Sequence, residues 1–219
     1  MYKRQARHRV SASAVLLAGT TAVATAGTGR NACGLFTMAH NRFRAGYDGA
    51  VANLGQIGFC VLDLTGRPSF DEVLARVWRA SLAGYRHSYY DPARLRRGFE
   101  DQGYEYPEVF LPHYYFNDVR LPGDVDADGP AAVTESALRA AAQRSTFAWT
   151  RGLEQSSWRQ LTHVVDEPGG VGITLSLDTR FQPPEAAEPL LRGLEALLVE
   201  AAFREVSWPW SPAPSSPIG

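Results

Sequence analysis

The fold is decided by a strand-and-helix unit that reads G-Q-I-G-F-C-V-L-D-L-T-G at residues 55–66 and P-S-F-D-E-V-L-A-R-V-W-R-A at residues 68–80. Residues 57–64 form a continuous apolar run, which predicts a buried strand, and the missing alternation predicts cover on both of its faces. Ser69 and Glu72 match the capping box, in which each side chain accepts a hydrogen bond from the other residue's backbone amide. The sequence therefore predicts a helix that begins at Ser69.

This helix has one apolar face, and its end carries a motif of chemical interest. The apolar residues recur at helical spacing and are Phe70, Val73, Leu74, Val77, Trp78, Leu82 and Tyr85. The unit closes with Y-R-H-S-Y-Y-D-P at residues 85–92, which holds the one H-x-x-x-D spacing in the chain, from His87 to Asp91. Pro92 interrupts the helix, and residues 93–102 are expected to resume it after a bend.

The segment before this unit contains a second helix and a second strand. Residues 12–26 are apolar on most sides, which predicts a central helix. Residues 32–39 (A-C-G-L-F-T-M-A) predict a buried strand, and residues 41–53 a loop. An alternative interpretation is a secretory signal, because residues 1–9 are basic and Ala24-Thr25-Ala26 is a plausible cleavage site.

Beyond residue 102, strands and helices continue to alternate, which predicts an α/β sandwich of a mixed sheet against helices. The predicted elements are a strand at 109–117, a loop at 121–130, a helix at 131–144, short strands at 146–151 and 160–165, an alternating strand at 171–181 with one buried face, and a Leu-rich helix at 190–203. From Trp208 the chain reads W-P-W-S-P-A-P-S-S-P, which predicts a linker or a disordered end.

The composition is ordinary for a globular domain, with 45% hydrophobic residues, 22 basic residues and 23 acidic residues among 219. This length supports one sizeable core or two small ones. The near-zero net charge predicts no nucleic-acid partner, and no apolar segment has the length that a bilayer requires. Cys33 and Cys60 lie in apolar runs, which predicts buried free thiols in a reducing compartment rather than a disulfide.

Several segments occur in an order that resembles the C-terminal half of a condensation domain from nonribosomal peptide synthetases. T-G-R at residues 28–30 with Asn41-Arg42 resembles that family's "T-G-r-d…N-R" segment, and residues 54–80 resemble its strand and helix around "d-l-s-G-d-p-S-F". Residues 85–92 stand in the place of its "H-q-d-x-P" element, and Tyr115-Phe116-Asn117 resembles its "F-N" strand.

The resemblance extends over residues 10–203 and implies the domain organisation, fold and chemistry. It implies a basic extension at 1–9, a condensation subdomain at 10–205 and a Pro/Ser-rich tail at 206–219. The implied fold is a chloramphenicol-acetyltransferase-like sandwich, a mixed β-sheet packed against helices. The implied function is amide formation in nonribosomal peptide (secondary metabolite) biosynthesis. The chain is then expected to be cytoplasmic and to bind no cofactor itself, while carrier proteins or other synthetase domains present phosphopantetheine-tethered substrates.

Two departures from the family leave the enzymatic activity open. Gly55-Gln56-Ile57-Gly58-Phe59 replaces the family's "G-x-F-V-N-T" and lacks its Asn-Thr. The family's catalytic H-H-x-x-x-D-G lies in the N-terminal half, at the interface with the half that this chain resembles, and the chain has no His-His pair. The resemblance therefore implies a half-domain that is inactive alone and that acts with a separate N-terminal half or as a homo-oligomer.

His87 and Asp91 are the candidate catalytic pair within this chain. They have the H-x-x-x-D spacing of the superfamily, with Arg86 in place of the first His and Pro92 in place of the Gly. A positioned His contributes to such transfers as a general base. The alternative is a structural role, in which His87 caps a helix end or bonds a carbonyl.

A second set of polar residues lies beside apolar strands. By resemblance, some of them line the channel where carrier-tethered substrates meet: Asn41, Arg42, Gln56, Asn117 and Asp118. The alternative is hydrogen bonding at turns and strand ends. His113 and His163 lie in predicted strands without metal-ligand spacing, and are expected to be core or edge histidines.

An acidic segment matches the calcium-loop pattern D-x-D-x-D-G-x₅-E, with Asp124, Asp126, Asp128 and Glu135 at the required offsets. Ala131 stands where such loops carry an aliphatic residue, and no second copy pairs with the segment. The alternative is a solvated acidic loop that precedes a helix, so no metal site is predicted as the main interpretation.

Three functions remain open from the sequence. The first is a condensation-like component that acts with a separate N-terminal half or inside a synthetase. The second is a stand-alone oligomeric acyltransferase that uses His87 and Asp91. The third is a non-catalytic remnant or interaction module, which predicts an exposed apolar patch where the missing half would pack.

Overall fold

The structure is a computed structural model, and the residues it describes are 10–26, 28, 30–42, 45–104, 114–120, 133–150, 152 and 158–210. The strands are β1 (Ala32–Ala39), β2 (Gln56–Asp63), β3 (Tyr114–Asp118), β4 (Gln160–Glu167) and β5 (Gly170–Leu177). The helices are α2 (Ala12–Thr25), α3 (Phe70–Arg86), α4 (Pro92–Glu100), α5 (Glu135–Ala142), the 3₁₀ turn η1 (Pro184–Ala186) and α6 (Ala187–Ala201).

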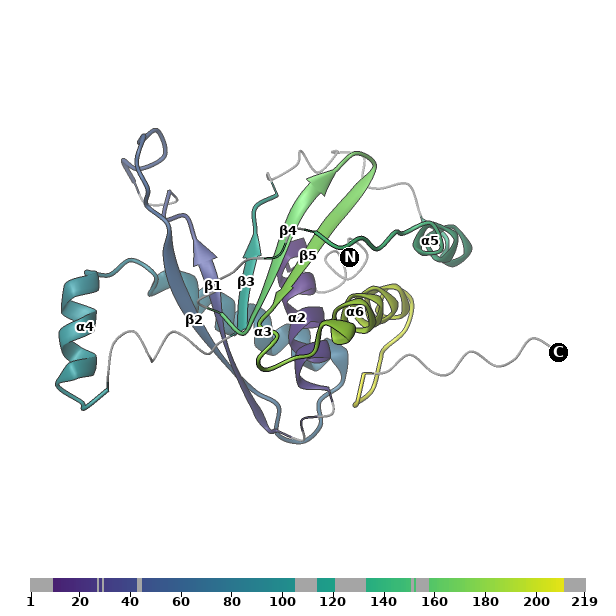
Figure 1. The fold of residues 1–219 in the computed structure, drawn as a ribbon, viewed down its shortest axis with the longest axis horizontal. Coiled ribbons are helices and arrows are strands. Elements are labelled where there is room, and N and C mark those ends of the chain that lie inside the picture. Colours follow the sequence, from purple (N-terminus) through teal and green to yellow (C-terminus); the bar gives the residue numbers. More distant parts are fainter. Residues whose placement is uncertain are drawn as a thin grey trace.

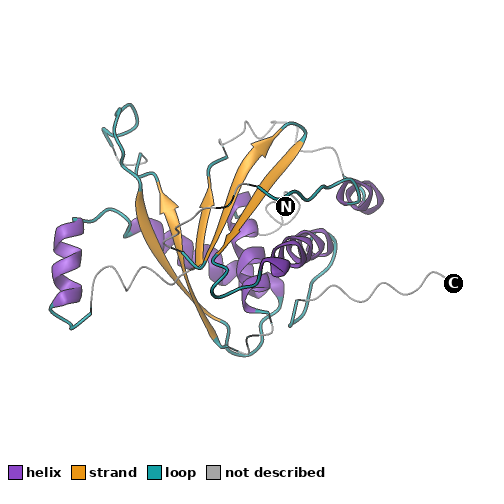
Figure 2. Ribbon diagram, viewed as in Figure 1, coloured by secondary structure: helices purple, strands orange, loops and turns teal. Residues whose placement is uncertain are grey.

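The five strands form one mixed sheet in the order β2-β1-β3-β4-β5 (Figures 1 and 2). The β1–β2 and β4–β5 pairs are antiparallel, whereas β3 is parallel to both of its neighbours. Figure 1 shows α4 and α5 projecting at opposite ends of the molecule, with α2, α3 and α6 gathered near the middle of the sheet. The predicted mixed sheet packed against helices is confirmed.

The sheet has two unlike faces. On the face that we call the inner face, Cys33, Leu35, Cys60, Leu62 and Val164 pack into one core with residues of α2, α3 and α6. The strand register places Phe36 opposite Phe59 and beside Tyr115, so these three rings lie on the other face, which we call the outer face.

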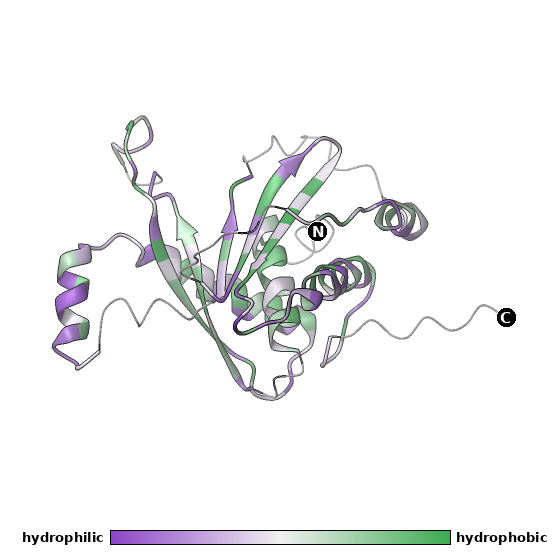
Figure 3. Cartoon of the chain, viewed as in Figure 1, coloured by the Kyte–Doolittle hydropathy of each residue, from purple (hydrophilic) through white to green (hydrophobic). Residues whose placement is uncertain are grey.

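The outer face of β2 is open. Phe59 is 51% exposed and Val61 62% exposed, and Met38 of β1 is also exposed. The prediction that both faces of residues 57–64 are covered is therefore wrong. Of the described helices, α2, α3 and α6 pack on the sheet, and all three pack on its inner face. The missing alternation in β2 therefore comes from apolar residues on an open face. Figure 3 shows the hydropathy of the residues along the strand.

Helix α2 is central, as predicted. Its N-cap is Ser11, whose side chain accepts a hydrogen bond from the Ala14 amide at 3.1 Å. Gly19 allows α6 to approach, because a Cβ there would lie 2.7 Å from a methyl of Leu194. Since most of α2 is buried in the core, the helical interpretation of residues 12–26 is confirmed.

Helix α3 begins with the predicted capping box: Glu72 accepts from the Ser69 amide at 2.7 Å, and Ser69 accepts from the Glu72 amide at 3.5 Å. Two glycines let this helix lie close to β2. A Cβ on Gly58 would stand 2.8 Å from the Gly84 carbonyl oxygen, and a Cβ on Gly84 would stand 2.9 Å from the Cys60 sulfur. The helix–strand distance is thus set by two residues without side chains.

Four sequence predictions need correction or lie partly or wholly outside the described residues. Residues 146–150 form no strand. The predicted strand at 109–117 is observed as β3 from Tyr114, and residues 109–113 and the loop 121–130 lie outside the described part. The predicted linker from Trp208 is wrong as far as Trp210, which is 3% exposed and donates its indole N–H to the Pro68 carbonyl at 2.9 Å.

We predict that Gly84→Ala destabilises the chain by roughly 1–3 kcal/mol, because the new methyl forces α3 away from β2. Gly98→Ala in α4 is the matched control, since a Cβ there meets nothing within 4 Å; it should raise stability by up to about 1 kcal/mol through helix propensity. Urea unfolding of both variants gives the comparison. Equal midpoints for Gly84→Ala and the unmutated chain would contradict the close contact.

Candidate functional site

The H-x-x-x-D motif forms the turn between α3 and α4. His87 is exposed and is the C-cap of α3, with its backbone amide donating to the Ala83 carbonyl. Asp91 is the N-cap of α4 and accepts hydrogen bonds from the Ala93 and Arg94 amides at 2.9 and 3.3 Å. Between these two described side chains there is no hydrogen bond or ion pair. The geometry favours the capping role, and a catalytic role stays a hypothesis.

Asn41, which is fully buried, holds this turn in place through hydrogen bonds. Its amide donates to the Leu54 carbonyl at 2.9 Å and to the Ser88 carbonyl at 3.4 Å, and its Oδ1 accepts from the Ser88 hydroxyl at 3.1 Å. Gln56 completes the network, since its Nε2 donates to the Tyr90 carbonyl at 2.7 Å and its Oε1 accepts from the Tyr90 amide. Asn41 and Gln56 thus hold the ends of β1 and β2 against the turn.

Arg42 orders the loop that follows β1. Its guanidinium donates to the backbone carbonyls of Tyr47, Ala50 and Ala52. The hydroxyl of Tyr47 in turn hydrogen-bonds that of Tyr89 at 2.8 Å. Three of the five predicted channel residues, Asn41, Arg42 and Gln56, are therefore brought together, and most of their described hydrogen bonds are with backbone groups.

We predict that Asn41→Ala lowers the unfolding free energy by about 2–4 kcal/mol, because it removes a buried amide and leaves its partners without hydrogen bonds. Asn41→Gly should cost about 1 kcal/mol less than Asn41→Ala, since Asn41 has a left-handed φ of 54° that glycine adopts without strain. Urea unfolding measures both. Equal losses in the two variants would show that the backbone conformation contributes nothing.

Asn117 and Asp118 lie at the end of β3, beside the end of β1, because the two strands are parallel. Asp118 forms a two-pronged ion pair with Arg120, with N–O distances of 2.8 and 2.7 Å. Burial alone raises the pKa of Asp118, but hydrogen bonds from Arg120 and Ser13 and the charge of Arg120 outweigh it, so that the pKa lies below its ordinary value. Asp118 is therefore a paired anion that ties the end of β3 to α2.

The outer face carries a row of aromatic rings that runs from β2 toward β4. The ring centroids are 4.9 Å apart for Phe59 and Phe36, 5.1 Å for Phe36 and Tyr115, and 6.2 Å for Tyr115 and Trp158. Gly34 makes room for the first ring, because a Cβ there would lie 3.2 Å from the tip of Phe59. The sequence does not predict this row, because its members come from four separate segments.

A polar row crosses the same face farther along. The register sets His163 of β4 beside Asn117 of β3 and opposite Thr174 of β5. Nε2 of His163 is buried, and within the described part of the chain nothing hydrogen-bonds to it. The signal available in the sequence was a histidine at an outward position of a strand, two residues from Leu161 and Val165.

The proposed calcium loop is described only at Glu135, since Asp124, Asp126 and Asp128 lie outside the described residues. Glu135 forms ion pairs with Arg139 at 2.6 Å and Arg204 at 3.0 Å. Within the described ranges, no group of three acidic, His or Cys side chains is placed to hold a metal. The calcium loop stays a prediction, and the described ion pairs of Glu135 anchor α5.

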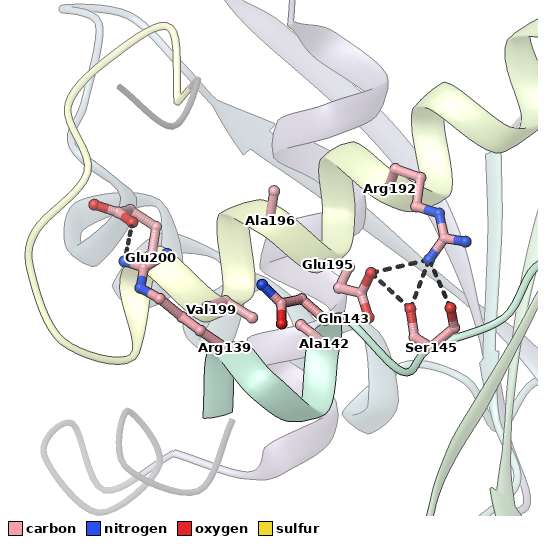
Figure 4. A pocket seen from close by; sticks show the side chains of 9 residues that line it. All are labelled: Arg139, Ala142, Gln143, Ser145, Arg192, Glu195, Ala196, Val199 and Glu200. Carbon is pink, nitrogen blue, oxygen red and sulfur yellow. Dashed lines mark hydrogen bonds and ion pairs between the residues drawn. The ribbon is translucent and has the colours of Figure 1, made fainter. Parts of the chain in front are cut away.

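A groove of about 490 Å³ separates α5 from α6 (Figure 4). Its charged walls are internally paired: Arg139 binds Glu200 at 2.9 Å, and Arg192 donates to the Ser145 hydroxyl at 2.6 Å. The Ser145 hydroxyl donates to Glu195 at 2.9 Å. Because α5 has no buried residue, these polar contacts hold it against α6.

We predict that α5 detaches in acid. A hydrogen bond from Arg139, with the charges of Arg139 and Arg204, holds the pKa of Glu135 below its ordinary value. The contribution of these pairs is therefore complete above the pKa of an unfolded Glu and is lost as the pH falls through the folded pKa. Backbone amide NMR signals of α5 should shift in that window. Glu135→Gln should remove the step and Glu188→Gln should leave it; a step unchanged in Glu135→Gln would contradict the assignment.

The two cysteines are excluded as nucleophiles. Both are free and buried, as predicted. Burial raises the pKa of Cys33 to about 11 and that of Cys60 to about 12, so both are neutral thiols near pH 7.

None of the described helices has the length and apolar character needed to cross a membrane.

Known proteins resemble this chain in structure and not in sequence. No protein-family model matches it, and no curated protein matches it. The first condensation domain of the CDA synthetase has a TM-score of 0.59 at 14% identity, over 91% of this chain and 41% of that chain. The condensation domain of the Monacolin K polyketide synthase MokA has a TM-score of 0.65 at 14% identity, over 92% and 43%.

A third relative is the EpoB cyclization-docking bidomain from Sorangium cellulosum, with a TM-score of 0.59 at 15% identity over 96% of this chain and 39% of that chain. The chain therefore spans about two-fifths of the length of each of these three structures. At these identities the likeness establishes the fold, and the fold is the one predicted. The chain has the chloramphenicol-acetyltransferase-like fold of about one half of a condensation domain.

Proposed function

We propose that this chain is a condensation-like component of nonribosomal peptide biosynthesis, which supplies the C-terminal half of an amide-forming acyl-transfer site. The second half, with the H-H-x-x-x-D-G motif, comes from another polypeptide or another part of a synthetase. The observation that carries the proposal is the fold match, which covers over nine-tenths of this chain and about two-fifths of condensation domains. Substrates arrive as thioesters on carrier proteins.

The outer face supports an arrangement in two halves. Exposed Met38, Phe59 and Val61 form an apolar strip on β1 and β2, alongside the aromatic row. Exposed apolar residues gathered in this way are typical of an interaction surface. An N-terminal half is the occupant that matches the length missing relative to the condensation domains. The strip would lie at the junction of the two halves.

The stand-alone alternative has less support. It requires His87 and Asp91 to act together, whereas Asp91 caps α4 through its carboxylate. His87 is exposed at a helix end, and no described residue orients its ring. A general base is normally oriented by a hydrogen-bonding neighbour. The third possibility is a folded remnant without activity. Such a remnant would also expose the apolar strip, so only an experiment distinguishes it from the proposed half-domain.

The test is reconstitution. The chain should be co-expressed with the H-H-x-x-x-D-G half encoded nearest to it, either upstream in frame or in a neighbouring gene. We expect the two to co-purify and, only together, to join two carrier-tethered aminoacyl groups into an amide. A Phe59→Asp, Val61→Asp double variant should lose the complex while the free chain stays folded. Val133→Asp is the matched control, because Val133 is 43% exposed and lies before α5.

Other results point elsewhere. Amide formation by the chain alone, lost in His87→Ala, would establish the stand-alone acyltransferase. A folded chain that neither pairs nor transfers would establish the remnant. A complex that survives the double variant would place the junction on a surface other than the β1–β2 strip.

A further inference from the structure

A small cavity lies between the inner face of the sheet and the helices α2 and α6. Its volume, measured with a water-sized sphere, is about 10 Å³, which is about what one water molecule needs. Leucines and Val23 supply its apolar wall, and its polar wall consists of Thr20 of α2 with Gln160 and Thr162 of β4. Cavities with an entirely apolar lining stay empty, whereas a cavity that offers two to four polar partners holds water.

Thr20 differs from the other two threonines of α2. The hydroxyls of Thr21 and Thr25 donate to carbonyls of the helix itself, that of Leu17 at 2.8 Å and that of Thr21 at 2.7 Å. Such a bond to the carbonyl four residues earlier is the usual way in which a helical threonine satisfies its hydroxyl. The hydroxyl oxygen of Thr20 is buried and hydrogen-bonds no described group. It therefore remains available to the cavity that Thr20 lines.

Thr162 lines the same cavity from the sheet. It is 1% exposed and lies within β4, opposite Leu175 of β5 and beside Phe116 of β3. Its hydroxyl oxygen is also buried, and no described group hydrogen-bonds to it. Valine has nearly the same shape and would fill this position without the cost of a buried, unsatisfied hydroxyl. The two hydroxyls thus lie on opposite walls of one cavity that has the volume of one water molecule.

We propose that the cavity binds one ordered water molecule, which hydrogen-bonds the hydroxyls of Thr20 and Thr162 and so joins α2 to the sheet. A hydroxyl both donates and accepts, so each threonine can meet either a proton or a lone pair of this water. Gln160 is 3% exposed and adds a side-chain amide to the same wall. The water thereby has the two to four partners that a buried water requires. The site does not depend on the proposed function.

A high-resolution crystal structure of the full chain tests the site directly. It should show one density peak at hydrogen-bonding distance, about 2.5–3.0 Å, from both hydroxyl oxygens. The peak should be absent in Thr162→Val. Thr21→Val is the matched control, because Thr21 is also buried but its hydroxyl already bonds the Leu17 carbonyl; this variant should keep the peak. An empty cavity in the unmutated chain overturns the proposal.

Urea unfolding gives a second readout in solution. Thr20→Val and Thr162→Val should each lower the folding equilibrium constant about three- to tenfold, because the water and the remaining hydroxyl lose a partner. Helix propensity adds little to the first effect, since valine and threonine have similar values. The double variant should lose no more than either single variant, because the second substitution removes a hydroxyl that has already lost its water.

The sign and the coupling of these effects distinguish a bound water from a dry cavity. Without a water, each valine removes an unsatisfied hydroxyl, so both single variants would raise the folding equilibrium constant and their effects would multiply independently. That result overturns the proposal. The control pair is Thr21→Val with Thr162→Val, whose effects should multiply independently, because the Thr21 hydroxyl bonds its own helix.

Discussion

The close approach of α3 to β2 constrains the rest of this molecule. Gly58 and Gly84 meet backbone to backbone, and neither position has room for a methyl group. This contact brings the apolar face of α3, including Val73 and Val77, onto the inner face of β1 and β2. Helix α2 then packs on α3, and α6 packs on α2 across Gly19. As a result, α2, α3 and α6 all lie on one side of the sheet.

The other side of the sheet is left with a surface of its own. Because α2, α3 and α6 lie on the inner face, this surface is formed by the outward-facing residues of β1 to β5. Apolar residues dominate at the β2 end, an aromatic row follows, and a polar group centred on His163 lies toward β5. An exposed apolar region of this kind is typical of a surface that binds another protein.

The sequence predicts the elements whose causes are local. Ser69 and Glu72 predict the start of α3, because a capping box involves only four consecutive residues. Residues 32–39 form β1, as their apolar run indicates. It does not show which face of β2 is covered, because cover depends on helices elsewhere in the chain. In the sequence, Trp210 belongs to a Pro-rich tail. In the fold, its indole N–H donates to the carbonyl of Pro68, 142 positions away. In the sequence, Asn41 and Gln56 stand out only as polar residues beside apolar strands, whereas their shared hydrogen bonds to the Ser88–Tyr90 turn depend on the fold.

The position of β2 at one end of the described sheet matters for how the chain is made in a cell. A strand at a sheet margin presents unpaired backbone groups, and here it also presents Phe59 and Val61. Newly made copies in which nothing covers this edge would associate with one another through it, and a net charge of −1 gives little repulsion between them. The balance between the supply of this chain and the supply of whatever covers β2 then decides how much of it remains in solution.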